Sequence, residues 1–225
     1  MKKNIFVACD FSSQDEAISL IEQIKNHIFG IKIGLQYVTS TGIDGVKALT
    51  KFNLPILYDV KAFDIKNTVK GFAKSLKKIG VSYATIHLLN GEETLKSIVE
   101  EVKDIKFIGV SVLTSFSDYN KDLEKLGFKD DVKNQVQRLV KIASKANLHG
   151  VVCSPLEVKI VKKIDPKLLC FTPGIRLESS NNDDQKRTMS AKEAIDEGSD
   201  YLIIGRPLTS GNPEENIKKI IKSLE

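Results

Sequence analysis

The sequence predicts an α/β fold, a single (β/α)8 TIM barrel in which residues 1–225 form one domain. Eight short apolar runs recur along the chain, and most are unbroken, as expected for strands covered on both faces. A helical pattern follows each run, and no linker rich in Pro, Gly or Ser divides the chain. A doubly wound sheet is the alternative, but no predicted strand leads into a Gly-x-Gly-x-x-Gly turn.

Each predicted element has a local reason. Pro55 suits the first position of the third strand, Ser12 and Ser13 are candidate caps of the first helix, and Gly80 ends the third helix. The predicted strands are residues 5–10, 31–34, 55–61, 83–88, 107–113, 150–154, 168–172 and 201–205. The predicted helices are residues 16–24, 41–51, 69–78, 93–102, 132–146 and 213–224, with a further helix opened by Pro155.

The composition limits the class of protein. The net charge of +5 comes without interleaved aromatic residues, so we expect solvated helix faces and an anionic ligand, and no nucleic acid partner. Cys9, Cys153 and Cys170 lack metal-binding spacing, which predicts reduced thiols in a cytoplasmic protein. No apolar stretch is long enough for a membrane span, and no membrane partner is expected.

The central stretch, residues 59–68, holds the strongest chemical signal. Asp59 and Lys61 are two residues apart, so on a strand their side chains point to the same side. Inside a barrel, such ions are tolerable only as a pair. Asp64 follows after a short turn, so the pattern gathers two carboxylates around Lys61, which keeps it charged and able to donate a proton. The alternative is a strand-end salt bridge with a helix-capping Asp64.

Polar residues also follow or end the other predicted strands. They are Asp10, Lys32, His87, Thr114, Ser115 and Ser154. Barrels of this type carry their active sites at these strand ends. Each residue has a plainer interpretation: Asp10 could cap a helix, Lys32 could extend to solvent, and His87 could be a core histidine. Their shared placement favours a site.

The last two strand ends indicate a phosphate site. Gly205 allows backbone N–H groups to approach an anion, and Arg206 can bind it through two N–H groups. The polar run that starts at residue 172 and includes Gln185 is too long for a plain turn and is typical of a lid or of a disordered link. The alternative for Arg206 is a surface arginine at a turn.

Five motifs resemble the orotidine 5'-phosphate decarboxylase family in its bacterial form, over essentially the whole chain. Residues 59–68 match Asp-x-Lys-x-x-Asp-Ile-Pro-Asn-Thr except at Lys66. The others are Val-Leu-Thr-Ser at 112–115, Thr-Pro-Gly-Ile-Arg at 172–176, Asp-Asp-Gln-Lys-Arg at 183–187 and Ile-Gly-Arg-Pro at 204–207. Each motif alone is weak, but five in order form a specific signature.

The resemblance implies decarboxylation of orotidine 5'-phosphate to uridine 5'-phosphate and CO2 in de novo pyrimidine synthesis, without a cofactor. Lys61 would protonate C6 within a network of Lys32, Asp59 and Asp64. Asp10 and Lys32 would hold the ribose, Thr114 or Ser115 the pyrimidine, and Gln185, Gly205 and Arg206 the phosphate. The implied substrate-binding set is Asp10, Lys32, Ile65, Thr68, Thr114, Ser115, Pro173, Arg176, Gln185, Gly205 and Arg206.

The resemblance also implies a homodimer, because in this family Asp64, Ile65 and Thr68 reach into the neighbouring subunit's site. Lys66 departs from the family's proline. Lysine makes the turn less rigid and adds charge near the dimer contact, so we expect a small effect on affinity. A more than tenfold loss of turnover in a Lys66→Pro variant would contradict this expectation.

Two rival functions stay open at this point. Sister enzymes such as 3-keto-L-gulonate 6-phosphate decarboxylase share the Asp-x-Lys-x-x-Asp core but use magnesium with a glutamate on the second strand. Lys32 stands at that position here and would repel a metal. A non-catalytic phosphate-binding barrel would explain Gly205 and Arg206, but not two carboxylates around Lys61.

Overall fold

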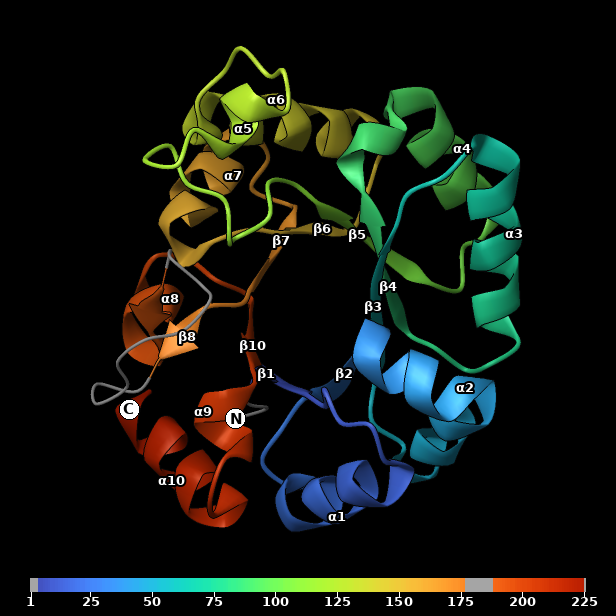
Figure 1. The fold of residues 1–225 in the computed structure, drawn as a ribbon, viewed down its shortest axis with the longest axis vertical. Coiled ribbons are helices and arrows are strands. Elements are labelled where there is room, and N and C mark those ends of the chain that lie inside the picture. The colour runs from blue at the N-terminus through green and yellow to red at the C-terminus, as the bar shows by residue number, and fades with distance from the viewer. Residues whose placement is uncertain (1–3, 177–187, 225) are drawn as a thin grey trace.

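The chain forms a closed barrel of eight parallel strands, as Figure 1 shows in a view down the barrel. The computed structural model describes residues 4–176 and 188–224. The strand order around the barrel is β1-β10-β7-β6-β5-β4-β3-β2. The barrel strands are β1 (Ile5–Ala8), β2 (Gly30–Gly34), β3 (Ile56–Ala62), β4 (Tyr83–His87), β5 (Lys106–Val110), β6 (Gly150–Val152), β7 (Leu169–Thr172) and β10 (Tyr201–Ile204). The predicted fold class is confirmed, and the doubly wound alternative is wrong.

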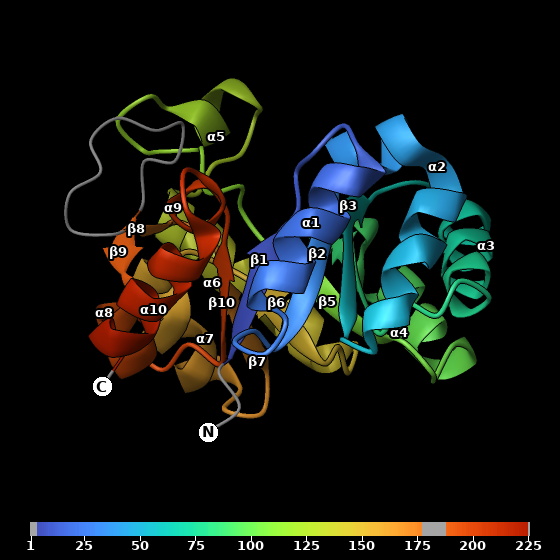
Figure 2. The same ribbon diagram turned by 90° about the horizontal axis from the view of Figure 1, so that it is seen from below.

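Helices form an outer ring around the strands (Figure 1). The longer helices are α1 (Gln14–Ile24), α2 (Leu35–Leu49), α3 (Lys66–Lys77), α4 (Glu92–Glu101), α6 (Val132–Lys145), α7 (Val158–Ile164), α8 (Ala191–Asp196) and α10 (Pro213–Ser223). The short ones are α5 (Asp122–Lys125), α9 (Arg206–Thr209) and the 3-10 turns η1 (Thr50–Phe52), η2 (Leu88–Asn90) and η3 (Pro155–Glu157). Viewed from the side, α5 stands above one end of the barrel (Figure 2). No helix in the described ranges is long and apolar enough to cross a bilayer.

Two layers of apolar side chains explain why the strands read as unbroken hydrophobic runs. One layer packs between the strands and the helices, and the other fills the barrel interior. The interior layer is aromatic near the strand starts, where Phe6 packs 5.6 Å from Tyr83 and 5.7 Å from Phe171, between ring centroids. Tyr201 stacks on Phe171 at 4.8 Å. These rings close the amino-terminal end of the barrel, so polar groups gather at the other end.

The main difference from the sequence-based prediction is α2, which begins at Leu35 instead of residue 41. Threonine has a low helix propensity, so the sequence pattern did not indicate this first turn. Here Thr39 and Thr41 donate their hydroxyls to the carbonyls of Leu35 and Tyr37, at 2.6 and 2.8 Å, and remain within the helix. Gly42, with φ of 65°, then kinks it. The short β8 (Ile175–Arg176) and β9 (Met189–Ser190) were also not predicted, whereas α8 is the helix expected after the seventh barrel strand.

The close approach of β2 to its neighbours yields a first prediction. A Cβ on Gly30 would lie 2.5 Å from both the Phe6 ring and the Pro55 carbonyl oxygen. Gly30→Ala should therefore lower the free energy of unfolding by about 1–3 kcal/mol through overpacking. At Gly71, on α3, an added Cβ would meet no other group within 4 Å, and Gly71→Ala should raise that free energy by about 0.5–1 kcal/mol. Urea unfolding followed by circular dichroism measures both, and equal stability of the two variants would contradict this packing.

Candidate active site

A cavity of about 620 Å³ opens at the carboxyl ends of the barrel strands. It collects side chains that are far apart in the sequence, because the ends of parallel strands meet at one end of a barrel. The predicted site residues that line it are Asp10, Lys32, Asp59, Lys61, Thr114, Ser115, Pro173, Arg176, Gly205 and Arg206. Val110, Val152 and Ile203 add an apolar side. The cavity thus combines charged groups with an apolar surface.

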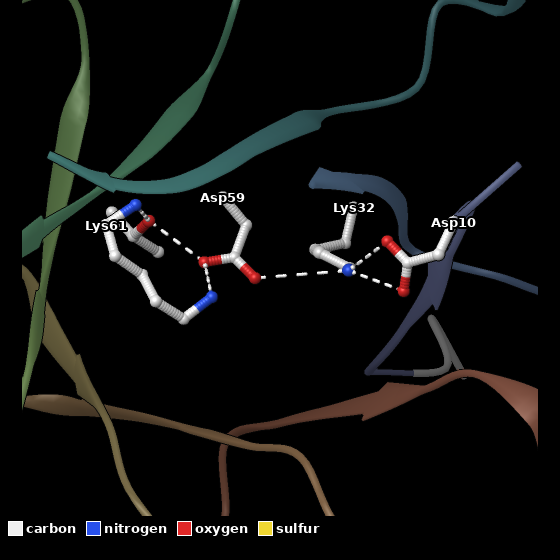
Figure 3. Close-up of polar contacts among 5 residues, drawn as sticks. Asp10, Lys32, Asp59 and Lys61 are labelled. Atoms are coloured by element: carbon white, nitrogen blue, oxygen red, sulfur yellow. Dashed lines mark hydrogen bonds and ion pairs between the residues drawn. The ribbon is translucent and has the colours of Figure 1, made fainter. Parts of the chain in front are cut away.

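Four charged side chains form an alternating row across the cavity (Figure 3). Lys32 Nζ donates to both Asp10 carboxylate oxygens, at 2.7 and 2.9 Å, and lies 3.9 Å from Asp59 Oδ2. Lys61 Nζ donates to Asp59 Oδ1 at 2.9 Å. Only 8% of the Lys32 side chain and 12% of the Asp59 side chain are exposed. Each of these buried ions therefore depends on its neighbours for compensation.

Gly34, at the end of β2, makes room for this row. A Cβ at that position would lie 3.0 Å from Asp10 Oδ1 and 3.3 Å from Lys32 Nζ. Any side chain at position 34 would crowd the ion pair between Asp10, which follows β1, and Lys32 on β2. Sequence reasoning treated Gly34 only as a strand end, because the contact appears only when the strands are adjacent.

The strand that carries Asp59 and Lys61 departs from regular pairing. β3 pairs with β4 through Tyr58 and Ala84, and then through Ala62 and Ile86, with a register shift between. Lys61 has a φ of 52°, in the left-handed region. Such a conformation costs about 1–3 kcal/mol and is retained where the surrounding structure imposes it. The two side chains nevertheless meet, as the sequence predicts.

Asp64 does not join this row, which corrects the expectation that it surrounds Lys61 together with Asp59 in the same chain. Its carboxylate is exposed and accepts the Ile65 N–H at 2.6 Å. Ile65, rather than Asp64, is the cap residue of α3. Ile65 and Thr68 are also exposed, and within the described residues none of the three lines the cavity. A single chain therefore leaves this part of the motif outside its own site.

Asn90 holds the loop that carries Asp64. Its side-chain amide donates to the carbonyls of Ala62 and His87, at 2.9 and 2.8 Å, and its oxygen accepts the Asp64 N–H at 3.3 Å. It thereby ties the end of β3 to the end of β4. Nothing in the local sequence pattern marks Asn90, because all three partners come together only in the folded barrel.

Two other predicted strand-end residues have structural roles. His87 Nδ1 accepts the Leu89 N–H at 3.2 Å, and burial, with a smaller effect of Lys61, lowers the pKa of His87. Ser154 is buried and caps η3 in a reciprocal pair of hydrogen bonds with Glu157. Burial raises the pKa of Cys9 to about 12, so this thiol stays protonated and is a poor nucleophile.

The expected phosphate end lies beside the Asp10 end of the charged row, because β10 pairs with β1. Gly205 follows β10 directly, and Arg206 begins α9; both line the cavity. Arg176, on β8, also lines it and donates through Nη1 to the Ile175 carbonyl at 3.0 Å. Gln185 lies outside the described residues. In the described part of the chain, no three His, Cys, Asp or Glu side chains cluster to hold a metal ion.

Comparisons with known proteins agree over the full chain. Residues 3–220 match the model of the family described as "Orotidine 5'-phosphate decarboxylase / HUMPS family". The chain is 42% identical to orotidine 5'-phosphate decarboxylase of Wolbachia pipientis, covering 98% of each chain, and 37% identical to that of Legionella pneumophila, covering 100% of each. The crystal structure of orotidine 5'-phosphate decarboxylase from Lactobacillus acidophilus matches with a TM-score of 0.84 and 29% identity, covering 100% of both chains.

The start of α3 yields a second prediction. Lys66 is the first residue of the helix and pairs with Glu93 at 2.7 Å on the surface. Because proline is tolerated there and the exposed pair is worth little, Lys66→Pro should change the free energy of unfolding by less than about 1 kcal/mol. Lys70→Pro, inside the same helix, should cost about 3 kcal/mol or more. Urea unfolding separates the two, and a large loss for Lys66→Pro would show that α3 begins elsewhere.

Proposed function

This chain belongs to the orotidine 5'-phosphate decarboxylase / HUMPS family, and we propose that it converts orotidine 5'-phosphate to uridine 5'-phosphate and CO2 in de novo pyrimidine synthesis. The observation that carries the proposal is the row Asp10–Lys32–Asp59–Lys61 inside the cavity. Full-length relatives with this enzyme name support it. A cavity of about 620 Å³ also suits a nucleotide-sized ligand.

In the proposed reaction, the bond between C6 and the carboxylate breaks, its electron pair stays on C6, and CO2 leaves. Lys61 then donates a proton to C6 and regains one from water. The negative charge of Asp59 opposes the substrate carboxylate but not the neutral CO2, so the repulsion falls as the bond breaks. The ammonium of Lys61 stabilises the carbanion, by about 4 kcal/mol at about 4 Å and an effective dielectric of about 20.

The proposed binding groups divide the substrate among three parts of the cavity. Asp10 and Lys32 hold the ribose, and Thr114 or Ser115 bonds the pyrimidine. Gly205, Arg206 and Gln185 hold the phosphate, with Pro173 and Arg176 beside them. Support comes from the position of the described members around one cavity. Binding energy from the phosphate, far from the reacting carbon, helps to position the carboxylate beside Asp59.

The proposal includes a homodimer in which each chain completes its partner's site. Asp64, Ile65 and Thr68 are exposed outside the chain's own cavity. Large apolar side chains are exposed at the ends of the adjacent strands β2 and β3: Leu35 by 65%, Phe63 by 61% and Ile65 by 74%. A second copy would cover this apolar surface and bring Asp64 close to Lys61.

One feature favours this reaction over the magnesium-dependent sister reactions. Lys32 Nζ lies between the carboxylates of Asp10 and Asp59, and its charge would repel a divalent cation there. We also propose that the chain is one domain and works in the cytoplasm, where its three free cysteines stay reduced.

The activity itself is the third prediction. Purified protein should decrease the ultraviolet absorbance of orotidine 5'-phosphate in excess EDTA. Lys61→Ala should reduce turnover by about 10²–10⁴-fold or more, because a general acid contributes that much. Lys96→Ala, an exposed lysine on α4, is the matched control and should retain full turnover.

Other results of this assay would assign a different function. Turnover of a keto-sugar phosphate with magnesium, and none of orotidine 5'-phosphate, would identify a sister enzyme. Tight binding of phosphate ligands without turnover of either substrate would identify a binding barrel.

The shared site is the fourth prediction. Lys61→Ala and Asp64→Asn should each be inactive as homodimers. After the subunits are mixed and exchanged, half of the dimers are hybrids with one intact site, so about one quarter of the parental turnover should return. Two Lys61→Ala chains carrying different affinity tags control for exchange. Complete exchange without recovered turnover would show that each chain uses its own Asp64.

A further inference from the structure

One residue of β4 faces three residues of β3 at the register shift. Between the pairs Tyr58–Ala84 and Ala62–Ile86, β3 contains Asp59, Val60 and Lys61, whereas β4 contains only Thr85. Two extra residues keep the alternation of side chains, so Asp59 and Lys61 still point inward. Thr85 is therefore the residue of β4 against which the bulged segment must be held.

The backbone of Lys61 is anchored by Thr85. The Lys61 N–H donates to Thr85 Oγ1 at 2.9 Å. This bond is made where the φ of Lys61 is 52°, a conformation that needs support from its surroundings. A side-chain acceptor at this position gives the displaced N–H a partner.

The same hydroxyl also orients the carboxylate of Asp59. A threonine hydroxyl has one proton, and Thr85 donates it to Asp59 Oδ1 at 2.9 Å. That oxygen also accepts from Lys61 Nζ at 2.9 Å. Thr85 is fully buried, with 0% of its surface exposed, so water cannot replace the hydroxyl without rearrangement.

We propose that Thr85 is a positioning residue that fixes both members of the reacting pair, the carboxylate of Asp59 and the backbone that carries Lys61. It acts through these two residues and does not line the cavity in the described structure. The hydroxyl holds Oδ1 of Asp59 toward Lys61, so that Oδ2 faces Lys32. The inference rests on the proposed function for its effect on turnover, but the anchoring of Lys61 is independent of it.

The test compares two substitutions of Thr85. Thr85→Val keeps the shape and removes the hydroxyl, and should lower kcat by about 10- to 100-fold with KM within about threefold. Thr85→Ser keeps the hydroxyl and should restore kcat to within about threefold of the parent. If Thr85 had only a role in stability, Thr85→Val would not lower kcat while leaving KM nearly unchanged.

Thr172→Val is the matched control. Thr172 is a fully buried threonine on β7 whose hydroxyl donates to the Tyr201 carbonyl at 3.3 Å and lies 3.0 Å from Ser199 Oγ, away from Asp59 and Lys61. Its substitution should shift the unfolding midpoint about as much as Thr85→Val, with kcat within about threefold of the parent.

Amide hydrogen exchange gives a readout that does not need activity. The Lys61 amide should exchange at least about tenfold faster in Thr85→Val than in the parent or Thr85→Ser, relative to the β4 amides. The inference is overturned if Lys61 exchange is unchanged, or if Thr85→Ser does not restore both exchange and kcat. If the parent does not decarboxylate orotidine 5'-phosphate, the proposed function fails, and exchange alone decides whether Thr85 anchors Lys61.

Discussion

The compensation of buried charge is the constraint on which the site depends. Lys32 and Asp59 are almost fully buried, so each needs partners of opposite charge. Asp10 and Lys61 extend the pair to two carboxylates and two ammonium groups, whose formal charges cancel. This balance allows charged groups inside a barrel whose remaining interior is apolar. It also explains why residue 34 is a glycine, because any side chain there would crowd the Asp10–Lys32 pair.

The two ends of the barrel differ in packing and in backbone geometry. Aromatic side chains close the end where the strands begin, and their packing holds the strands in register. The other end departs from ideal geometry, with the register shift in β3 and the left-handed backbone at Lys61. Local strain of this kind persists only on a rigid base. The hydrogen bonds of Thr85 and Asn90 secure the strained segment on its β4 side.

The described chain presents an incomplete version of its own motif. Asp59 and Lys61 face the cavity, whereas Asp64, only three residues later, points to solvent beside exposed apolar side chains. The turn that ends β3 divides the motif into an inner half, which contains Asp59 and Lys61, and an outer half, which begins at Asp64. In the proposed dimer the outer half serves the neighbouring cavity, so catalysis and assembly depend on the same short segment.

The barrel could be predicted without the structure, because eight apolar runs followed by helical patterns can be recognised locally. The family motifs also predicted Asp59, Lys61, Arg176 and Arg206 as site residues, and all four line the cavity; the family membership is confirmed. Only the tertiary structure revealed the contacts of Gly34, Thr85 and Asn90, and the outward position of Asp64. Those contacts depend on which residues of adjacent strands face each other. A register shift of two residues preserves the local alternation, so the sequence pattern contains no trace of it.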